Sequence, residues 1–425
     1  MTRIRRVTTR TFRSLRSRNY RLFLTGQLVS VVGTWMHTVA LGWLVLKLTS
    51  SGVALGTTVA LQFLPLLVLG AWSGSVADRL DKRKIMIATQ VASGILAILL
   101  WSLVVTGSIV LWMVYLEAFL QGCVSMLDMP ARQSFVTEMV GAADVPNAVS
   151  LNSAVFNSGR LVGPAIAGVL IASVGLAPCF LLNGISYFAV VAALVAMRPA
   201  ELQRGAPVVD ETRRVRAGLR YVRETPELLT VLLMLAVIGT FGFNFTVVVP
   251  LVARFAFHAG PELYGALFSA MAAGSLVGAL VTAARPGPTR RFLMGSALAF
   301  GAACVLSSMA PTATWEAVAL AIVGVTTMLF LATANSTLQL ASRPAMRGRV
   351  MALYGLVILG STPIGAPLMG WIAEQWGARA TLAVGGGMTL LAALAALAWN
   401  ASRGEAVLRP RQDLPLPAGE PARAA

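Results

Sequence analysis

Long apolar runs alternate with short polar segments along most of the chain, and this pattern predicts membrane-spanning helices. A helix needs about 20 mostly apolar residues to cross the hydrocarbon core of a bilayer. The first run follows a basic segment but is long and lacks a small-residue cleavage site, which indicates an anchor and not a removed signal peptide. Twelve runs are long enough: 22–46, 53–76, 85–106, 109–129, 148–174, 177–197, 228–251, 262–284, 291–309, 315–338, 348–373 and 378–400.

The composition supports an all-α membrane protein, and the placement of charge sets its orientation. The chain is 57% hydrophobic and 12% charged, whereas soluble domains carry about 25% charged residues. Of 34 Lys and Arg residues, 30 fall in the two tails and in alternate segments between spans. Basic segments stay on the cytoplasmic side, so we expect a multi-pass plasma-membrane protein with both termini cytoplasmic. The net charge of +17 then needs no nucleic-acid partner.

One polar stretch divides the spans into six and six, and the two groups repeat weakly. Three glycines recur 202 residues later: Gly122, Gly163 and Gly168 match Gly324, Gly365 and Gly370. Transporters built from two related halves bind substrate between them, near the midplane. We predict a basic cytoplasmic tail (1–21), a six-helix half (22–197), a cytoplasmic linker with an amphipathic helix (198–227), a second six-helix half (228–400) and a disordered cytoplasmic tail (401–425).

The turn after the second span, "GSVADRLDKRK", carries a dense pattern of small, acidic and basic residues. Gly74 suits a close helix crossing, and Asp78 at the membrane edge needs a cation or a helix N-terminus. The basic residues Arg79, Lys82 and Arg83 would equally suit a plain cytoplasmic turn.

The whole pattern resembles the signature motif between spans 2 and 3 of the major facilitator superfamily, with substitutions at Val76, Asp81 and Lys82. The resemblance implies a major facilitator fold of twelve helices in two pseudo-symmetric halves. It also implies an inner-gate latch, in which Asp78 faces the start of span 11 and Lys82 bridges to Asp128 at the inner end of span 4.

A second motif, "NSGRLVGPAIAG", lies in span 5. Gly159, Gly163 and Gly168 allow another helix to approach closely, and Pro164 bends the span. Close packing alone would give this pattern, but it also resembles the proline-glycine motif of the superfamily's antiporters. Much of the chain resembles the branch of macrolide, siderophore and lysophospholipid exporters, which implies a small-molecule substrate, protons as the coupling ion and a monomer.

Two charged residues lie deep inside the predicted spans, away from their ends: Glu117 in span 4 and Arg160 in span 5. A charge at the bilayer centre costs about 2.5–3.5 kcal/mol on insertion scales, so we expect the two to pair on adjacent helices. The pair could be permanent and structural. Alternatively, Glu117 could exchange a proton while Arg160 tunes it or holds substrate. In a third arrangement Arg160 pairs with Asp128 and Glu117 faces the cavity.

Further polar side chains inside the spans could contact substrate or form hydrogen bonds between helices. His37 is a second candidate for the proton because histidine as a residue type titrates near neutral pH, although its own span holds no acid. These cavity candidates are Gln27, His37, Gln62, Gln121, Asn157, Asn183, Asn244 and Asn335.

The sequence contains no phosphate-binding loop, no metal-ligand cluster and no credible Ser/His/Asp set, so we expect neither a cofactor, a metal nor an enzyme. The three cysteines lie in apolar runs without metal spacing. We predict a secondary transporter that exports an amphipathic, drug-like molecule against a proton gradient by alternating access. Siderophore or lysophospholipid translocation, import, and a non-transporting scaffold are the alternatives.

Overall fold

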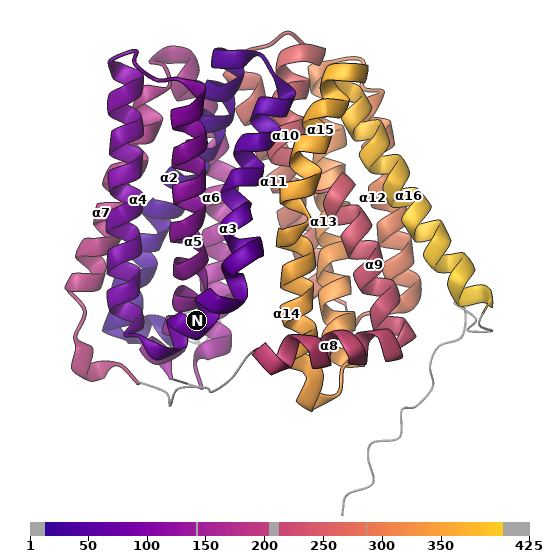
Figure 1. The fold of residues 1–425 in the computed structure, drawn as a ribbon, viewed down its shortest axis with the longest axis horizontal. Coiled ribbons are helices and arrows are strands. Elements are labelled where there is room, and N and C mark those ends of the chain that lie inside the picture. Colours follow the sequence, from indigo (N-terminus) through magenta and orange to yellow (C-terminus); the bar gives the residue numbers. More distant parts are fainter. Residues whose placement is uncertain (1–12, 142, 204–211, 286, 403–425) are drawn as a thin grey trace, which may run out of the picture.

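The computed structural model describes residues 13–141, 143–203, 212–285 and 287–402; side chains at 71–72, 74–78 and 212–216 are not described. The described chain is helical. Its first six long helices lie side by side as one half of the molecule (Figure 1). They are α2 (Arg18–Thr49), α3 (Gly52–Arg79), α4 (Lys82–Val105), α5 (Leu111–Val140), α6 (Val145–Ser173) and α7 (Ala177–Val195), preceded by a short 3-10 turn, η1 (Arg13–Arg16).

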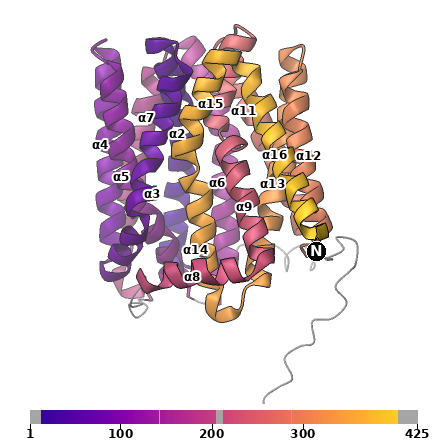
Figure 2. The same ribbon diagram turned by 45° about the vertical axis from the view of Figure 1, so that its right-hand side comes forward.

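The second half contains the remaining spans, and the turn η2 (Pro199–Glu201) and the helix α8 (Thr212–Glu224) connect the halves. Helix α8 lies across one end of the bundle, beneath α9 and α14 (Figure 2). We call this the basal end, and the opposite one the far end. The elements of the second half are α9 (Pro226–Phe241), α10 (Phe245–Leu251), the π-helical turn η3 (Val252–Ala256), α11 (Pro261–Ala283), α12 (Arg290–Ser308), α13 (Ala313–Ala341), α14 (Pro344–Gly360), α15 (Thr362–Trp376) and α16 (Ala378–Ser402).

The predicted twelve-helix, two-half fold is confirmed. By length and composition, eleven continuous or joined helices of the described chain could cross a membrane. The twelfth is α5, whose interior polar residues Glu117, Gln121 and Asp128 lower its hydropathy. This helix carries the predicted span 109–129 together with the unusual carboxylates.

Two spans predicted as continuous helices, 228–251 and 348–373, are interrupted in the structure. The first breaks between α9 and α10 at residues 242–244, and the second breaks at Ser361 between α14 and α15. Pro363 stands in the first turn of α15, where a missing N–H is tolerated but would interrupt the hydrogen bonds of a continuing helix. The two breaks face each other, because a Cβ on Gly239 of α9 would lie 2.5 Å from Ser361 Oγ.

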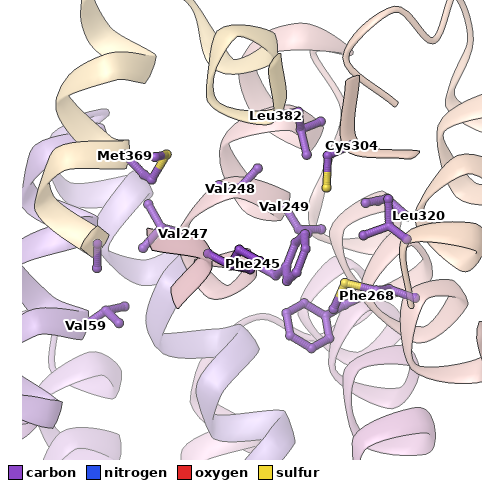
Figure 3. Close-up of a cluster of buried hydrophobic side chains, with 14 of the residues drawn as sticks. Val59, Phe245, Val247, Val248, Val249, Phe268, Cys304, Leu320, Met369 and Leu382 are labelled. Atoms are coloured by element: carbon purple, nitrogen blue, oxygen red, sulfur yellow. The ribbon is translucent and has the colours of Figure 1, made fainter. Parts of the chain in front are cut away.

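The interior of the second half is apolar around α10. Phe245 and three consecutive valines of α10 point towards side chains of α11, α12, α13, α15 and α16, as Figure 3 shows. Val59 of α3 joins this cluster from the first half. Burial of such side chains stabilises the second half, but this cluster itself offers no chemistry.

The two halves contact each other most closely towards the far end, through α3 with α15 and α6 with α11. A Cβ on Gly56 would lie 2.3 Å from the carbonyl oxygen of Ala366, and one on Gly265 would lie 2.3 Å from that of Pro164. Both positions therefore require glycine. Ser51 Oγ also donates to Glu374 Oε1 at 2.6 Å across the far end.

Candidate functional site

A cavity of about 220 Å³ lies inside the first half, between helices α2 to α7. Its wall is strongly polar for a membrane interior, and polar faces at this depth must point into the bundle or a wet cavity. Gln121, Ser125 and Asp128 reach it from one face of α5, as their spacing predicts. The predicted cavity residues that line it are His37, Gln62, Gln121 and Asn183.

Glu117 lies one helical turn from Gln121 and contacts His37. His37 Nε2 is 3.4 Å from Glu117 Oε1, and their side chains are only 9% and 8% exposed. The Phe180 ring packs edge-on against the imidazole with centroids 5.1 Å apart. Within the described chain, neither Glu117 oxygen accepts a hydrogen bond of good geometry, and His37 Nδ1 has no partner. The pair is therefore buried, ionisable and loosely held.

The predicted contact between Glu117 and Arg160 is wrong. The Arg160 guanidinium lies against Trp35, with Cζ 5.6 Å from the ring centroid, and no ion pair forms with it among the residues described. Sequence spacing placed both charges at similar depth but could not give the rotation of α6 about its axis. His37 was the second candidate for the proton because its own span holds no acid. It contacts an acid of a different span, Glu117 of α5.

Asp128, by contrast, has three hydrogen-bonding partners. It accepts hydrogen bonds from Thr89 Oγ1 at 2.8 Å and Gln90 Nε2 at 3.0 Å, and it forms an ion pair with Arg132 one turn later on α5. Arg132 Nη1 in turn donates to Gln27 Oε1 at 2.9 Å. Asp128 therefore ties α5 to α4 and, through Arg132, to α2. The alternative pairing of Arg160 with Asp128 is also wrong.

The predicted bridge from Lys82 to Asp128 is wrong as well, because Lys82 Nζ binds Glu138 Oε1 at 2.6 Å. Span 4 was predicted to end at residue 129, but α5 continues through Pro130 to Val140. This extension brings Glu138, and not Asp128, level with the start of α4. The position of an acid relative to a turn depends on where its helix ends, and the predicted end was too early.

Among the other residues of the "GSVADRLDKRK" motif, Arg83 has hydrogen-bond partners that the structure describes. Arg83 donates to the carbonyl oxygens of Leu194 at 2.8 Å and Val195 at 3.1 Å, so it satisfies the last turn of α7. Arg79 is exposed at the end of α3. Gly74 and Asp78 belong to α3, but their surroundings lie outside the described residues.

The span 5 motif packs α6 against one helix of each half. A Cβ on Gly159 would meet Val31, and one on Gly163 would lie 2.6 Å from the Trp35 Cβ, both on α2. Beyond Pro164, Gly168 faces α11 of the other half. The motif therefore serves close packing here.

Three predicted cavity asparagines do not line the cavity. Asn157 donates to the carbonyl oxygen of Ser153 in its own helix at 2.8 Å, and Asn244, in the break before α10, donates to that of Thr240 in α9 at 2.7 Å. Asn335 accepts from Gln339 at 2.6 Å. The cavity is also lined by residues that were not predicted to line it, among them Trp35, Gln90, Arg132 and Tyr187. The contact of Arg132 with Asp128 could have been predicted from the sequence, because residues four apart lie on the same face of a helix.

The comparisons with known proteins agree with this architecture. The multidrug efflux pump Tap of Mycolicibacterium fortuitum is 27% identical over 390 residues, covering 88% of this chain and 94% of that protein. The macrolide efflux protein A of Streptococcus pyogenes is 22% identical, covering 83% and 88%. The staphyloferrin A transporter of Staphylococcus aureus is 27% identical, covering 61% of this chain and 65% of its own length.

Solved structures share the fold at low sequence identity. A bacterial homologue of the human lysosomal transporter Spinster, inward-facing and occupied, superposes with a TM-score of 0.71 at 14% identity, covering 91% of this chain and 97% of that one. A mutant of the nucleoside transporter NupG gives 0.71 at 12% identity, covering 90% and 99%. Residues 9–420 match the family described as transmembrane secretion effectors. The chain therefore belongs to the transmembrane secretion effector family of major facilitator transporters.

Proposed function

We propose that the protein is a monomeric, proton-coupled exporter of amphipathic small molecules in the plasma membrane, with its basal end in the cytoplasm. The family assignment and the relatives named as efflux pumps support export. The basic residues of the tails, of α8 and of the turns at the basal end support this orientation. Siderophore translocation is the second candidate, favoured by the likeness to a staphyloferrin A transporter.

The contacts between the halves support a resting state that is closed at the far end. Glu374 of α15 also accepts from the backbone N–H of Val53 at 3.0 Å. Arg254 Nη2 donates to Ser50 Oγ at 3.1 Å. Both contacts join the two halves at that end. For alternating access, the halves 22–197 and 228–400 would rock as bodies, break these contacts and close at the basal end.

The observation that carries proton coupling is the buried contact between His37 and Glu117. One proton changes the net charge of this pair from minus one to zero. A buried net charge is costly to keep away from water, so the neutral pair favours a dehydrated, closed cavity and the charged pair favours one open to solvent. Asp128 and Arg132, the other charged residues that line the cavity, compensate each other and do not supply this change.

The experiment is transport by the Glu117→Gln variant in proteoliposomes. A thermal-shift screen of amphipathic drugs would first identify a compound that stabilises the purified protein. Glutamine mimics a permanently protonated acid, so the variant should retain exchange of that compound across the membrane and lose accumulation driven by a pH gradient. Glu138→Gln, which alters a buried acid paired elsewhere, should remain driven by the gradient. Gradient-driven accumulation by Glu117→Gln would refute the assignment.

A further inference from the structure

Arg160 is a cation near the middle of α6, and no described residue supplies a counter-charge to it. The carboxylates buried in the described spans all have other partners: Glu117 contacts His37, Asp128 binds Arg132, Glu138 binds Lys82 and Glu316 accepts from Ser307. An unpaired arginine at this depth is costly, and arginines inside spans mark substrate or ion pathways.

Packing of α6 on α2 places Arg160 beside Trp35. Because Gly163 has no side chain, the Trp35 Cβ approaches α6 closely, and the Arg160 Cζ lies 5.6 Å from the indole centroid. Arg160 Nε and Trp35 Nε1 are both buried, and neither has a hydrogen-bond acceptor within the described part of the chain. Two unsatisfied N–H donors thus belong to neighbouring side chains.

Aromatic rings from both halves pack against Trp35. The Phe156 ring lies 6.0 Å from Trp35 at 70°, and the Phe268 ring of α11 lies 5.6 Å away at 46°. Trp35 and Phe156 also line the cavity of about 220 Å³. This corner, formed by Arg160, Trp35, Phe156 and Phe268, therefore borders the cavity through Trp35 and Phe156. It contacts the other half of the transporter through Phe268.

We propose that Arg160 and Trp35 bind the anionic group of the transported molecule, and that the substrate class is an amphipathic organic anion with a planar apolar body. A carboxylate or phosphate would accept from both donors, since the guanidinium matches such oxygens in a bidentate manner. The apolar body would lie against Phe156 and Phe268, which favour edge-on or offset ring contacts. This inference rests on the proposed transport function and adds the charge of the substrate.

A purely structural role for Arg160 predicts a different response to substitution. If its stacking on Trp35 anchored the fold, loss of the charge would destabilise the substrate-free protein. If instead Arg160 pairs with an anion only when substrate is bound, Arg160→Gln removes an unpaired buried charge from the substrate-free protein. The melting temperature of that protein should then stay the same or rise. Arg379→Gln is the matched control, because the Arg379 Cζ lies 5.4 Å from the Phe257 centroid at the far end.

The binding test compares 1-naphthoate with its uncharged amide, 1-naphthamide, by equilibrium dialysis on the purified full-length protein. The wild type and Arg379→Gln should bind the acid about tenfold more tightly than the amide, as a charged hydrogen bond provides. Arg160→Gln should bind both alike, and Arg160→Lys should keep part of the preference. Glu117→Gln should keep it fully, so failure of proton coupling and failure of this subsite are distinguishable.

Several results would overturn the proposal. One is a preference for the acid that survives in Arg160→Gln, and another is a wild type that binds the two compounds equally or binds neither. An Arg160→Gln protein with a lower melting temperature than the wild type, or one that fails to fold, would show that Arg160 has a structural role. Naphthoate binding in detergent that disappears in nanodiscs containing phosphatidylglycerol would place a lipid phosphate, and not a transported anion, at this corner.

Discussion

Asp128 and Glu117 lie eleven residues apart on the same helix and are both buried, yet their surroundings are opposite. Asp128 receives two neutral hydrogen bonds and an arginine. Glu117 has one loose contact, to a histidine. Loss of the Asp128 charge would disturb three hydrogen-bonding partners, whereas Glu117 has a single partner. The difference separates an acid that holds helices together from the one that we propose carries a proton.

The largest effect should follow from Asp128→Asn, which would leave Arg132 without its acid. Removing one partner of a buried pair costs about 3–5 kcal/mol, and we expect the lower end because the Arg132 side chain is 30% exposed. Melting temperature and monodisperse yield would measure the loss, and Asp128→Asn combined with Arg132→Gln should recover part of it. An Asp128→Asn protein as stable as the wild type would break the comparison.

A smaller effect should follow from Glu138→Gln, which weakens the bond to Lys82. The side chains are 16% and 11% exposed, and a hydrogen bond between charged groups contributes about 1.5–3 kcal/mol. A double-mutant cycle of Lys82→Gln with Glu138→Gln should give a clear coupling energy. The same cycle of Lys82→Gln with Asp128→Asn should give almost none, and the reverse pattern would restore Asp128 as the partner of Lys82.

The smallest effect on stability should follow from Glu117→Gln. The amide can still bond to His37, so we expect a change of about 1 kcal/mol or less, measured by thermal unfolding beside Asp128→Asn. Gln121→Ala, on the same face of α5, is a suitable control for polar loss without loss of charge. A destabilisation by Glu117→Gln as large as that of Asp128→Asn would make Glu117 a structural anchor.

Hydropathy and motif spacing predicted the twelve spans and the family, because both depend on local sequence. They did not predict which charges meet, because that depends on helix rotation and length. Glu117 and Arg160 had plausible depths, but the glycines of α6 placed Arg160 against Trp35 of α2. Lys82 found Glu138 because α5 continues beyond Pro130. His37 was undervalued because its acid lies on another helix.

The central claim is that a proton on Glu117 shifts the two halves between their arrangements. Its most direct test is the distance between spin labels on Lys84 and Ala345, both exposed at the basal end of opposite halves, in a variant with Cys123, Cys179 and Cys304 replaced by alanine. Distances would be measured over a series from about pH 6 to about pH 8. The distance distribution should shift with pH in the background protein and in Glu138→Gln, and should stay constant in Glu117→Gln. A Glu117→Gln protein that shifts as much as its background would contradict the account.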